Sequence, residues 1–356
     1  MADVQISKKK TRFPSSQLDS LPPEMRASEE EVENIEKTYW KRTFHDMAKD
    51  WRLYIMLVPL LFFLLCWKYF PIASMVVSFK DYTAGSGFGG GVYSSAWIGF
   101  DSFIYLFKTT EFWSAFRNTF TLSFYGLVFG FPFPIILALF FSEIKNKLFL
   151  STAQVFTYMP KFISTVVVTS LLGMLLQSSN AASNIAAGPI GYIFENAFHL
   201  TNLVSNPYAF RSIYIISGMW ETAGYSSIVY FAAILGISPT NYEAARIDGA
   251  NKMQQVRYVT FPGMAPTLVI MLILRMGELL TIGYEKIYLL QQLGTYGSTY
   301  QTSQTISTYV INVIMTSSSL NQGIGAAADL FNSLLSMVLV LGSNQIARKV
   351  SSTSLF

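Results

Sequence analysis

The sequence contains one cysteine, two histidines and unusually few charged residues. Cys66 is its only thiol, so an intrachain disulfide and a cysteine zinc cluster are both excluded. His45 and His199 lie far apart and have no Cys or carboxylate companions at ligand spacing, so we expect no metal site. Charged residues make up 13% of the chain, against about a quarter in soluble domains. We therefore expect part of the chain to lie in a lipid bilayer and not in water.

Several motifs of catalysis and nucleotide binding are also missing. There is no Gly-x-x-x-x-Gly-Lys-Ser/Thr loop, so any ATP and its magnesium must be bound by another subunit. The absence of His-Glu-x-x-His, Gly-x-Ser-x-Gly and paired-Asp metal motifs disfavours a polytopic membrane enzyme. The net charge of +4 comes without a basic stripe interleaved with aromatics, so nucleic-acid binding has little support.

Long apolar stretches dominate what is present. Hydrophobic residues make up 51% of the chain, and a spanning helix needs about 20 mainly apolar residues. Six stretches meet this need: 53–79, 118–141, 155–177, 211–235, 264–283 and 327–347. The sequence therefore predicts an all-α, polytopic membrane protein with six transmembrane helices.

The basic residues predict the orientation in the bilayer. With the N-terminus inside, the external loops hold only four basic residues: Lys80, Lys108, Arg117 and Lys286. The cytoplasmic segments then hold most of the others, Lys161 among them, as the positive-inside rule requires. The first fifty residues are too polar for a signal peptide. We therefore expect both termini in the cytoplasm.

The N-terminal region differs in character from the rest. Residues 28–31 read Ser-Glu-Glu-Glu, a capping box that predicts a helix from 29 to about 50. Its loose apolar stripe favours an elbow helix along the cytoplasmic membrane surface, with partner binding as the alternative. We divide the chain into a cytoplasmic tail (1–50), a transmembrane domain (51–350) and a short cytoplasmic tail (351–356).

A distinctive segment, 237–262, lies between the fourth and fifth predicted spans. Ser238 is a natural N-cap and Pro239 sits at the favoured first position, so a short helix is expected to begin there. Gly249 can supply a left-handed C-cap or a tight bend, and Pro262 marks the entry to the fifth span. This pattern predicts two short helices that meet at an angle beneath the membrane.

The segment resembles the cytoplasmic Glu-Ala-Ala loop of binding-protein-dependent ABC importer permeases, in which Glu-Ala-Ala is followed by Asp-Gly-Ala and then by a hydrophobic residue and Pro. Residue types and spacing agree over about twenty positions. In that family the first helix seats in a cleft of the ATP-binding subunit. The resemblance implies contact with an ATPase for Glu243, Ala244, Ala245, Arg246, Asp248, Gly249, Lys252 and Pro262.

The resemblance covers most of the chain from Asp50 onward and favours permeases of the oligosaccharide and polysaccharide type. Its supporting segments include 68–71 (Lys-Tyr-Phe-Pro), 158–160 (Tyr-Met-Pro) and 306–310 (Ile-Ser-Thr-Tyr-Val). It implies a type I importer permease in the bacterial inner membrane. Its implied partners are a second homologous permease, two ATP-binding subunits, an external substrate-binding lipoprotein, the lipid bilayer and an oligosaccharide substrate. Amino acids or phosphate are the alternative cargo.

Polar and aromatic residues at membrane depth are the candidates for the substrate pathway. Buried charge in a bilayer costs roughly 2.5–3.5 kcal/mol on insertion scales, and aromatic rings suit the C–H faces of sugars. The candidates are Trp220, Glu221, Tyr225, Arg275, Glu278, Tyr284, Glu285 and Tyr288. Arg275 and Glu278, three residues apart, share a helix face and could pair. A purely structural ion pair and lipid-facing rings are the alternative interpretation.

Overall fold

A computed structural model describes residues 49–82, 90–179, 186–294, 297–315 and 319–350. The chain divides into two compact units, residues 1–74 and 75–356. In the described part of the first unit, α3 (Trp51–Leu64) continues through the π-helix η2 (Leu65–Tyr69) into α4 (Phe70–Ala73). The 3-10 helix η3 (Ser74–Phe79) follows. The predicted elbow helix, 29–50, and the tail 351–356 lie outside the described residues.

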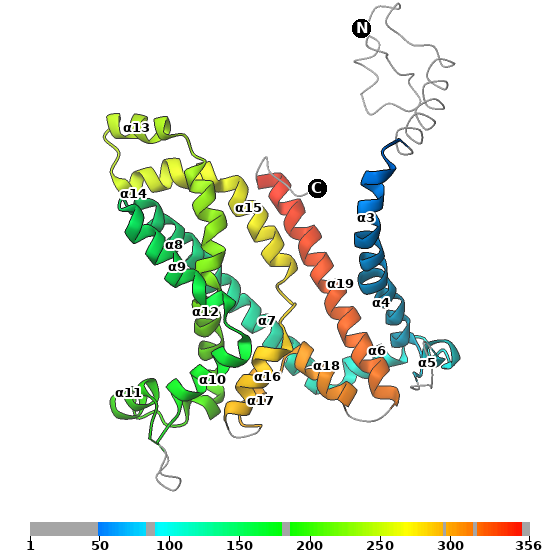
Figure 1. Cartoon of the computed structure of the whole chain (residues 1–356). Coiled ribbons are helices and arrows are strands. Elements are labelled where there is room, and N and C mark those ends of the chain that lie inside the picture. Colours follow the sequence, from blue (N-terminus) through cyan, green and yellow to red (C-terminus); the bar gives the residue numbers. More distant parts are fainter. Residues whose placement is uncertain (1–48, 83–89, 180–185, 295–296, 316–318, 351–356) are drawn as a thin grey trace, which may run out of the picture. The chain divides into compact units, whose positions relative to one another are not determined.

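The second unit is built from helices (Figure 1). Its first half contains α5 (Gly90–Ser94), α6 (Asp101–Lys108), α7 (Thr110–Gly130), α8 (Pro132–Glu143), α9 (Lys147–Tyr158), η4 (Met159–Phe162), α10 (Thr165–Leu176) and α11 (Pro189–Phe198). Its second half contains η6 (Leu203–Ser205), α12 (Pro207–Leu235), α13 (Pro239–Ile247), α14 (Lys252–Gln255), η7 (Val256–Thr260), α15 (Phe261–Gly277), α16 (Tyr284–Leu293), α17 (Tyr300–Ser303), α18 (Ile306–Met315) and α19 (Ser319–Val350). Among the described residues the only β contact outside helices is a single bridge between Lys80 and Trp97.

The helices account for the six predicted stretches, but the third, 155–177, is sharply bent. Four helical segments of the described chain are long and apolar enough to cross a membrane: Trp51–Phe79, Thr110–Glu143, Lys252–Gly277 and Gln322–Lys349. Two bent pairs, Lys147–Phe162 with Thr165–Leu176 and Pro207–Leu235 with Pro239–Ile247, bring the number to six if each is one span. The all-α class with four to six apolar spans agrees with the prediction.

The third stretch, 155–177, is broken where the sequence suggested one continuous segment. Its two parts meet at an angle of 101°. The break has a local cause, because Ser164 accepts a hydrogen bond from the Val167 amide and so starts a new helix. Pro160 lies just before the break, in the 3-10 turn η4. Two short helices therefore replace a straight span.

The fifth stretch, 264–283, ends earlier than expected. Helix α15 ends at Gly277, and Glu278 takes the C-cap position, so residues 278–283 connect α15 to α16 as turn and extended chain. The polar segments 178–210 and 284–326, which follow the third and fifth stretches, contain α11, α16 and α18. Each of these helices has an apolar face, and in α16 that face buries Ile287 and Leu290.

Helix α12 lies among the helices of the second unit and carries parts of two hydrophobic clusters. One joins Phe210 to Leu122, Ile282, Ile287 and Leu290, and the other joins Tyr230 and Ile234 to Ile135, Ala138 and Met264. The helix also passes very close to α9. A Cβ atom on Gly224 would lie 2.0 Å from the carbonyl oxygen of Thr157, so only glycine permits this approach.

Candidate coupling segment and translocation cavity

Helix α13 forms the first half of the coupling segment, residues 237–262. It leaves the end of α12 at a bend of 68° and has no buried residue. Ser238 occupies the N-cap position, but its hydroxyl pairs with the Thr240 hydroxyl at 2.8 Å and does not cap the backbone. Glu243 is exposed, and Ile247, an apolar side chain, is 87% exposed. An exposed apolar side chain on a helix whose neighbouring side chains are small is typical of a docking surface.

The end of α13 follows the predicted chain reversal. Asp248 is the C-cap residue and Gly249 has φ +77°, the left-handed conformation that glycine adopts without strain. Asn251 then caps α14 through a capping box with Gln254, with side-chain to backbone hydrogen bonds of 2.9 and 2.7 Å. The two short helices expected from the sequence are α13 and α14.

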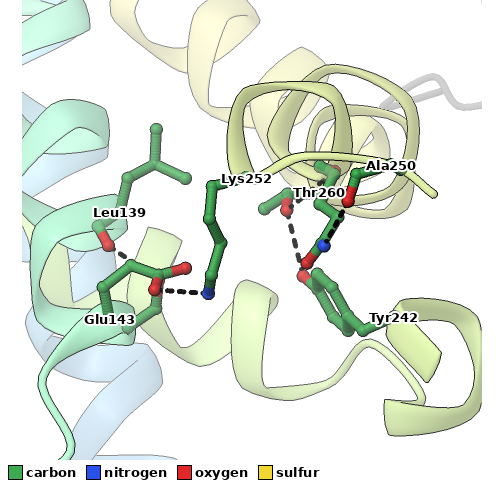
Figure 2. A network of polar contacts seen from close by, with 8 residues as sticks. Leu139, Glu143, Tyr242, Ala250, Lys252 and Thr260 are labelled. Carbon is green, nitrogen blue, oxygen red and sulfur yellow. Dashed lines mark hydrogen bonds and ion pairs between the residues drawn. The ribbon is translucent and has the colours of Figure 1, made fainter. Parts of the chain in front are cut away.

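Two side-chain contacts fix the coupling segment, one to helix α8 and one between its own two halves (Figure 2). The Lys252 ammonium lies 2.6 Å from the carboxylate of Glu143, the last residue of α8. The hydroxyls of Tyr242 on α13 and Thr260 in η7 share a hydrogen bond of 3.0 Å. The ion pair is exposed, whereas Thr260 is buried. Lys252, which the family resemblance assigns to ATPase contact, is thus paired inside this chain.

The coupling segment continues into α15 without a loop. Helices α14, η7 and α15 follow one another directly, and η7 is a π-helix, a form common at functional sites. Pro262 lies at the start of α15, but the helix continues there from η7, so its missing N–H removes one helical hydrogen bond at the junction. Ile237 packs on Gly263, since a Cβ there would lie 2.7 Å from the Ile237 Cδ1 atom. Helix α13 is therefore connected to two spanning helices, to α12 along the chain and to α15 through the contact of Ile237 with Gly263.

A cavity of about 700 Å³ lies between α7, α12, α15 and the start of α16. It adjoins both hydrophobic clusters of α12, because Leu122 and Ile282 belong to one and Tyr230 to the other. Its polar and charged lining comprises Ser123, Lys161, Tyr214, Glu221, Thr222, Ser226, Tyr230, Arg275, Glu278, Thr281 and Lys286. Three of the predicted pathway residues, Glu221, Arg275 and Glu278, are thus brought to one cavity.

Four of the charged residues of the cavity form two ion pairs, which differ in distance and in burial. Glu221 and Lys286 are 2.9 Å apart with side chains only 14% and 13% exposed, and the Lys286 ammonium lies 5.8 Å from the centre of the Tyr214 ring. Arg275 and Glu278 pair as their spacing predicts, but at 3.7 Å and with side chains 51% and 72% exposed. The first pair is a buried structural contact and the second is loose.

Sequence reasoning missed two cations of this cavity. We placed Lys286 in an external loop and Lys161 among the cytoplasmic basic residues, yet both line the cavity. The sequence did contain one indication of a cation, because Glu221 lies inside an apolar stretch and an unpaired charge at membrane depth is costly. The sequence could not say which cation, since Lys286 lies 65 positions further on.

The other pathway candidates lie elsewhere. Tyr225 packs edge-on against Phe162 with ring centres 6.1 Å apart, while Tyr284 and Tyr288 are about half exposed. Glu285 lies in the first turn of α16, where a carboxylate is stabilised by the helix dipole. Trp220 lines a second cavity, of about 870 Å³, between α10, α11 and α12. For these residues contact with a substrate stays a prediction.

The second cavity is larger but almost wholly apolar. Its lining is mostly Leu, Ile, Val and Phe, with few polar groups. A sugar placed there would leave its hydroxyl groups without hydrogen-bond partners, at a cost of about 1–3 kcal/mol each. The smaller, charged cavity therefore suits a polar solute better.

In the part of the chain that the structure describes, apolar helical spans enclose a charged cavity, and an exposed helix follows the end of one span. These features are typical of a membrane transport subunit. Residues 130–352 match the family described as binding-protein-dependent transport system inner membrane component, and the chain belongs to that family. It is a component of a membrane transporter and not itself an enzyme.

Individual relatives match over most of their length. Protein LplB of Bacillus subtilis is 30% identical over 310 residues, covering 87% of this chain and 92% of the relative. The polygalacturonan/rhamnogalacturonan transport system permease protein YteP of the same organism is 31% identical over 319 residues, covering 89% and 94%. A chain from the crystal structure of a bacterial ABC transporter involved in import of the acidic polysaccharide alginate is 35% identical, with a TM-score of 0.75 and coverage of 87% and 99%.

Proposed function

We propose that this chain is the permease subunit of an ATP-driven importer that moves oligosaccharides or polysaccharide fragments across the bacterial inner membrane. The observation that carries the proposal is the agreement of fold and sequence, over 87% of the chain, with a subunit of the alginate importer. The permease YteP, named for polygalacturonan and rhamnogalacturonan, supports the same class of cargo.

The proposed assembly contains a second homologous permease, two ATP-binding subunits and an external binding protein. A related solved structure holds the alginate transporter together with a periplasmic protein carrying an alginate pentasaccharide. ATP and magnesium belong to the partner subunits in this proposal, because the chain has no phosphate-binding loop.

Coupling to the ATPase runs through α13 in this proposal. The exposed side chains of Glu243, Arg246 and Ile247, over a thin surface that includes Ala244, enter a cleft of the ATP-binding subunit. Ala245, Asp248 and Gly249 shape the end of that surface. Closure of the ATP-binding subunits pushes α13, and the contacts at Thr260 and Gly263 carry the movement into α15. The spans then exchange inward-open and outward-open arrangements.

The orientation proposed from the basic residues places the coupling segment and both termini in the cytoplasm. Figure 1 supports this for the second unit, because α13, α14 and the C-terminal end of α19 lie at one end of it, while α11, α16 and α17 lie at the other. Arg348 and Lys349, in the last turn of α19, follow the positive-inside rule in this orientation.

The substrate pathway proposed here passes through the charged cavity. Glu221, Arg275 and Glu278 offer ion and hydrogen-bond partners, and Tyr214 and Tyr230 offer aromatic rings.

Uptake by a deletion strain tests the proposed function. A strain lacking this chain should lose uptake of labelled oligosaccharides from a glycan panel and regain it when the chain is restored. Retained uptake of every glycan, with loss of uptake of an amino acid or phosphate, would show that the cargo belongs to another class.

A further inference from the structure

The charged cavity holds more positive than negative groups. Its lining includes three cations, Lys161, Arg275 and Lys286, against two carboxylates, Glu221 and Glu278. Charged side chains are costly in a membrane protein unless a partner or a ligand compensates them. The surplus of positive charge therefore needs an explanation beyond the packing of the helices.

The buried pair does not supply that surplus. Lys286 lies 2.9 Å from Glu221, and both side chains are nearly covered, so each neutralises the other. Lys286 is further covered by the Tyr214 ring. This pair joins α16 to α12 and leaves no free positive charge for a ligand.

The other two cations are available. The Arg275 guanidinium is half exposed, and its partner Glu278 is 3.7 Å away and mostly in the open. Such an exposed pair contributes little, so a carboxylate that binds both guanidinium arms replaces it readily. Lys161 has no carboxylate within ion-pair distance among the residues that the structure describes. The two cations come from separate elements, α15 and η4.

We propose that Arg275 and Lys161 bind the carboxylates of an acidic oligosaccharide, a chain of uronic acid residues, as it passes through the cavity. The inference rests on the proposed import of carbohydrate. It adds that the carbohydrate is negatively charged and names the residues that bind its carboxylates. Arg275 gives bidentate recognition of a planar carboxylate, and Lys161 gives a compact second charge. Phe131, Tyr214 and Tyr230 line the same cavity and suit the C–H faces of the sugar rings.

The test measures uptake in the native strain, where the partners and the external binding protein stay unchanged. The probes are a labelled oligogalacturonide and oligomers of the same length in which the carboxylates have been reduced stepwise to alcohols. Arg275→Gln should raise the KM for the fully acidic oligomer about tenfold, which corresponds to 1.4 kcal/mol. The difference from the wild type should shrink as carboxylates are removed.

Three further variants complete the test. Lys161→Gln should raise the same KM about threefold to tenfold, and Arg275→Lys should lie between wild type and Arg275→Gln because it keeps charge but loses the bidentate geometry. Lys108→Gln removes an exposed cation of α6 outside the cavity and should change nothing. If Arg275→Gln fails to accumulate in the membrane, Lys161→Gln carries the same prediction alone.

The outcomes separate this inference from the function on which it rests. Equal effects of Arg275→Gln and Lys161→Gln on acidic and fully reduced oligomers, or no effect on either, would overturn the carboxylate-binding role while import of carbohydrate stands. If the wild type takes up none of these oligomers but does take up other, neutral glycans, the acidic cargo is wrong and carbohydrate import again stands. Uptake of no glycan at all would refute both.

Discussion

The coupling segment and the charged cavity differ in how the chain builds them. The coupling segment is continuous, its α13 has no buried residue, and it is shaped by local contacts such as the positive φ of Gly249 and the capping box at Asn251. The cavity collects residues from positions 122 to 286, and its central contact joins two side chains 65 positions apart. Changes in the first should therefore affect transmission of force, and changes in the second should affect stability and selection of cargo.

The variant Glu243→Lys is the sharpest test of the coupling segment. Reversal of an exposed charge on the proposed docking surface should lower uptake at least about tenfold, because a like charge facing a partner costs several kcal/mol. The amount of assembled transporter should not change. Uptake and co-purification of the ATP-binding subunits measure the two effects.

A matched control is Glu111→Lys, which reverses an exposed carboxylate in the first turn of α7, away from the coupling segment. It should leave uptake close to that of the wild type. Wild-type uptake by the Glu243→Lys variant would refute the coupling role.

The role of the charged cavity in stability is tested at its buried ion pair, Glu221 with Lys286. Lys286→Met alone leaves Glu221 buried and unpaired, so it should lower the free energy of unfolding by about 3–5 kcal/mol. The double variant Lys286→Met with Glu221→Leu should recover most of that loss, since an apolar pair of similar volume replaces the ions. Thermal inactivation of the purified complex measures both. A double variant no more stable than the single one would contradict a direct pair.

A smaller effect is expected at the contact between α13 and η7. Tyr242→Phe removes the hydrogen bond to the buried Thr260 hydroxyl, worth about 0.5–1.5 kcal/mol. The looser coupling segment should move less sugar per ATP hydrolysed, with ATP hydrolysis itself retained. Tyr258→Phe, an exposed tyrosine of the same π-helix, is the control. An unchanged ratio of sugar to ATP would show that the contact does not transmit movement.

The smallest effect is expected at the exposed pair of Glu143 and Lys252. Pairs of this kind contribute about 0–1 kcal/mol and are screened by salt. Lys252→Ala and Glu143→Ala should each lower stability slightly, and the double variant should lose no more than either single one. Additive losses would mean that Lys252 acts through another partner, as the family resemblance suggests for contact with the ATPase.

The sequence by itself determined the class of this protein and the coupling segment. Apolar stretches of spanning length, the motif at Glu243, the N-cap position of Ser238 and the turn at Gly249 are all properties of neighbouring residues. Local conformation follows from local sequence, so these features could be recognised without a structure. The charge of the basic residues likewise predicts orientation, because that rule counts residues near span ends.

Only the tertiary structure decided which side chains meet. It placed Lys286 against Glu221, drew Lys161 into the cavity wall and bent the stretch 155–177 by 101°. It also directed Trp220 into the apolar cavity, although Glu221 beside it lines the charged one. Contacts between distant positions depend on how several helices pack together, and the spacing along one chain does not contain that information. Adjacent residues of a helix point in different directions, so only the packed fold shows which cavity each of the two residues lines.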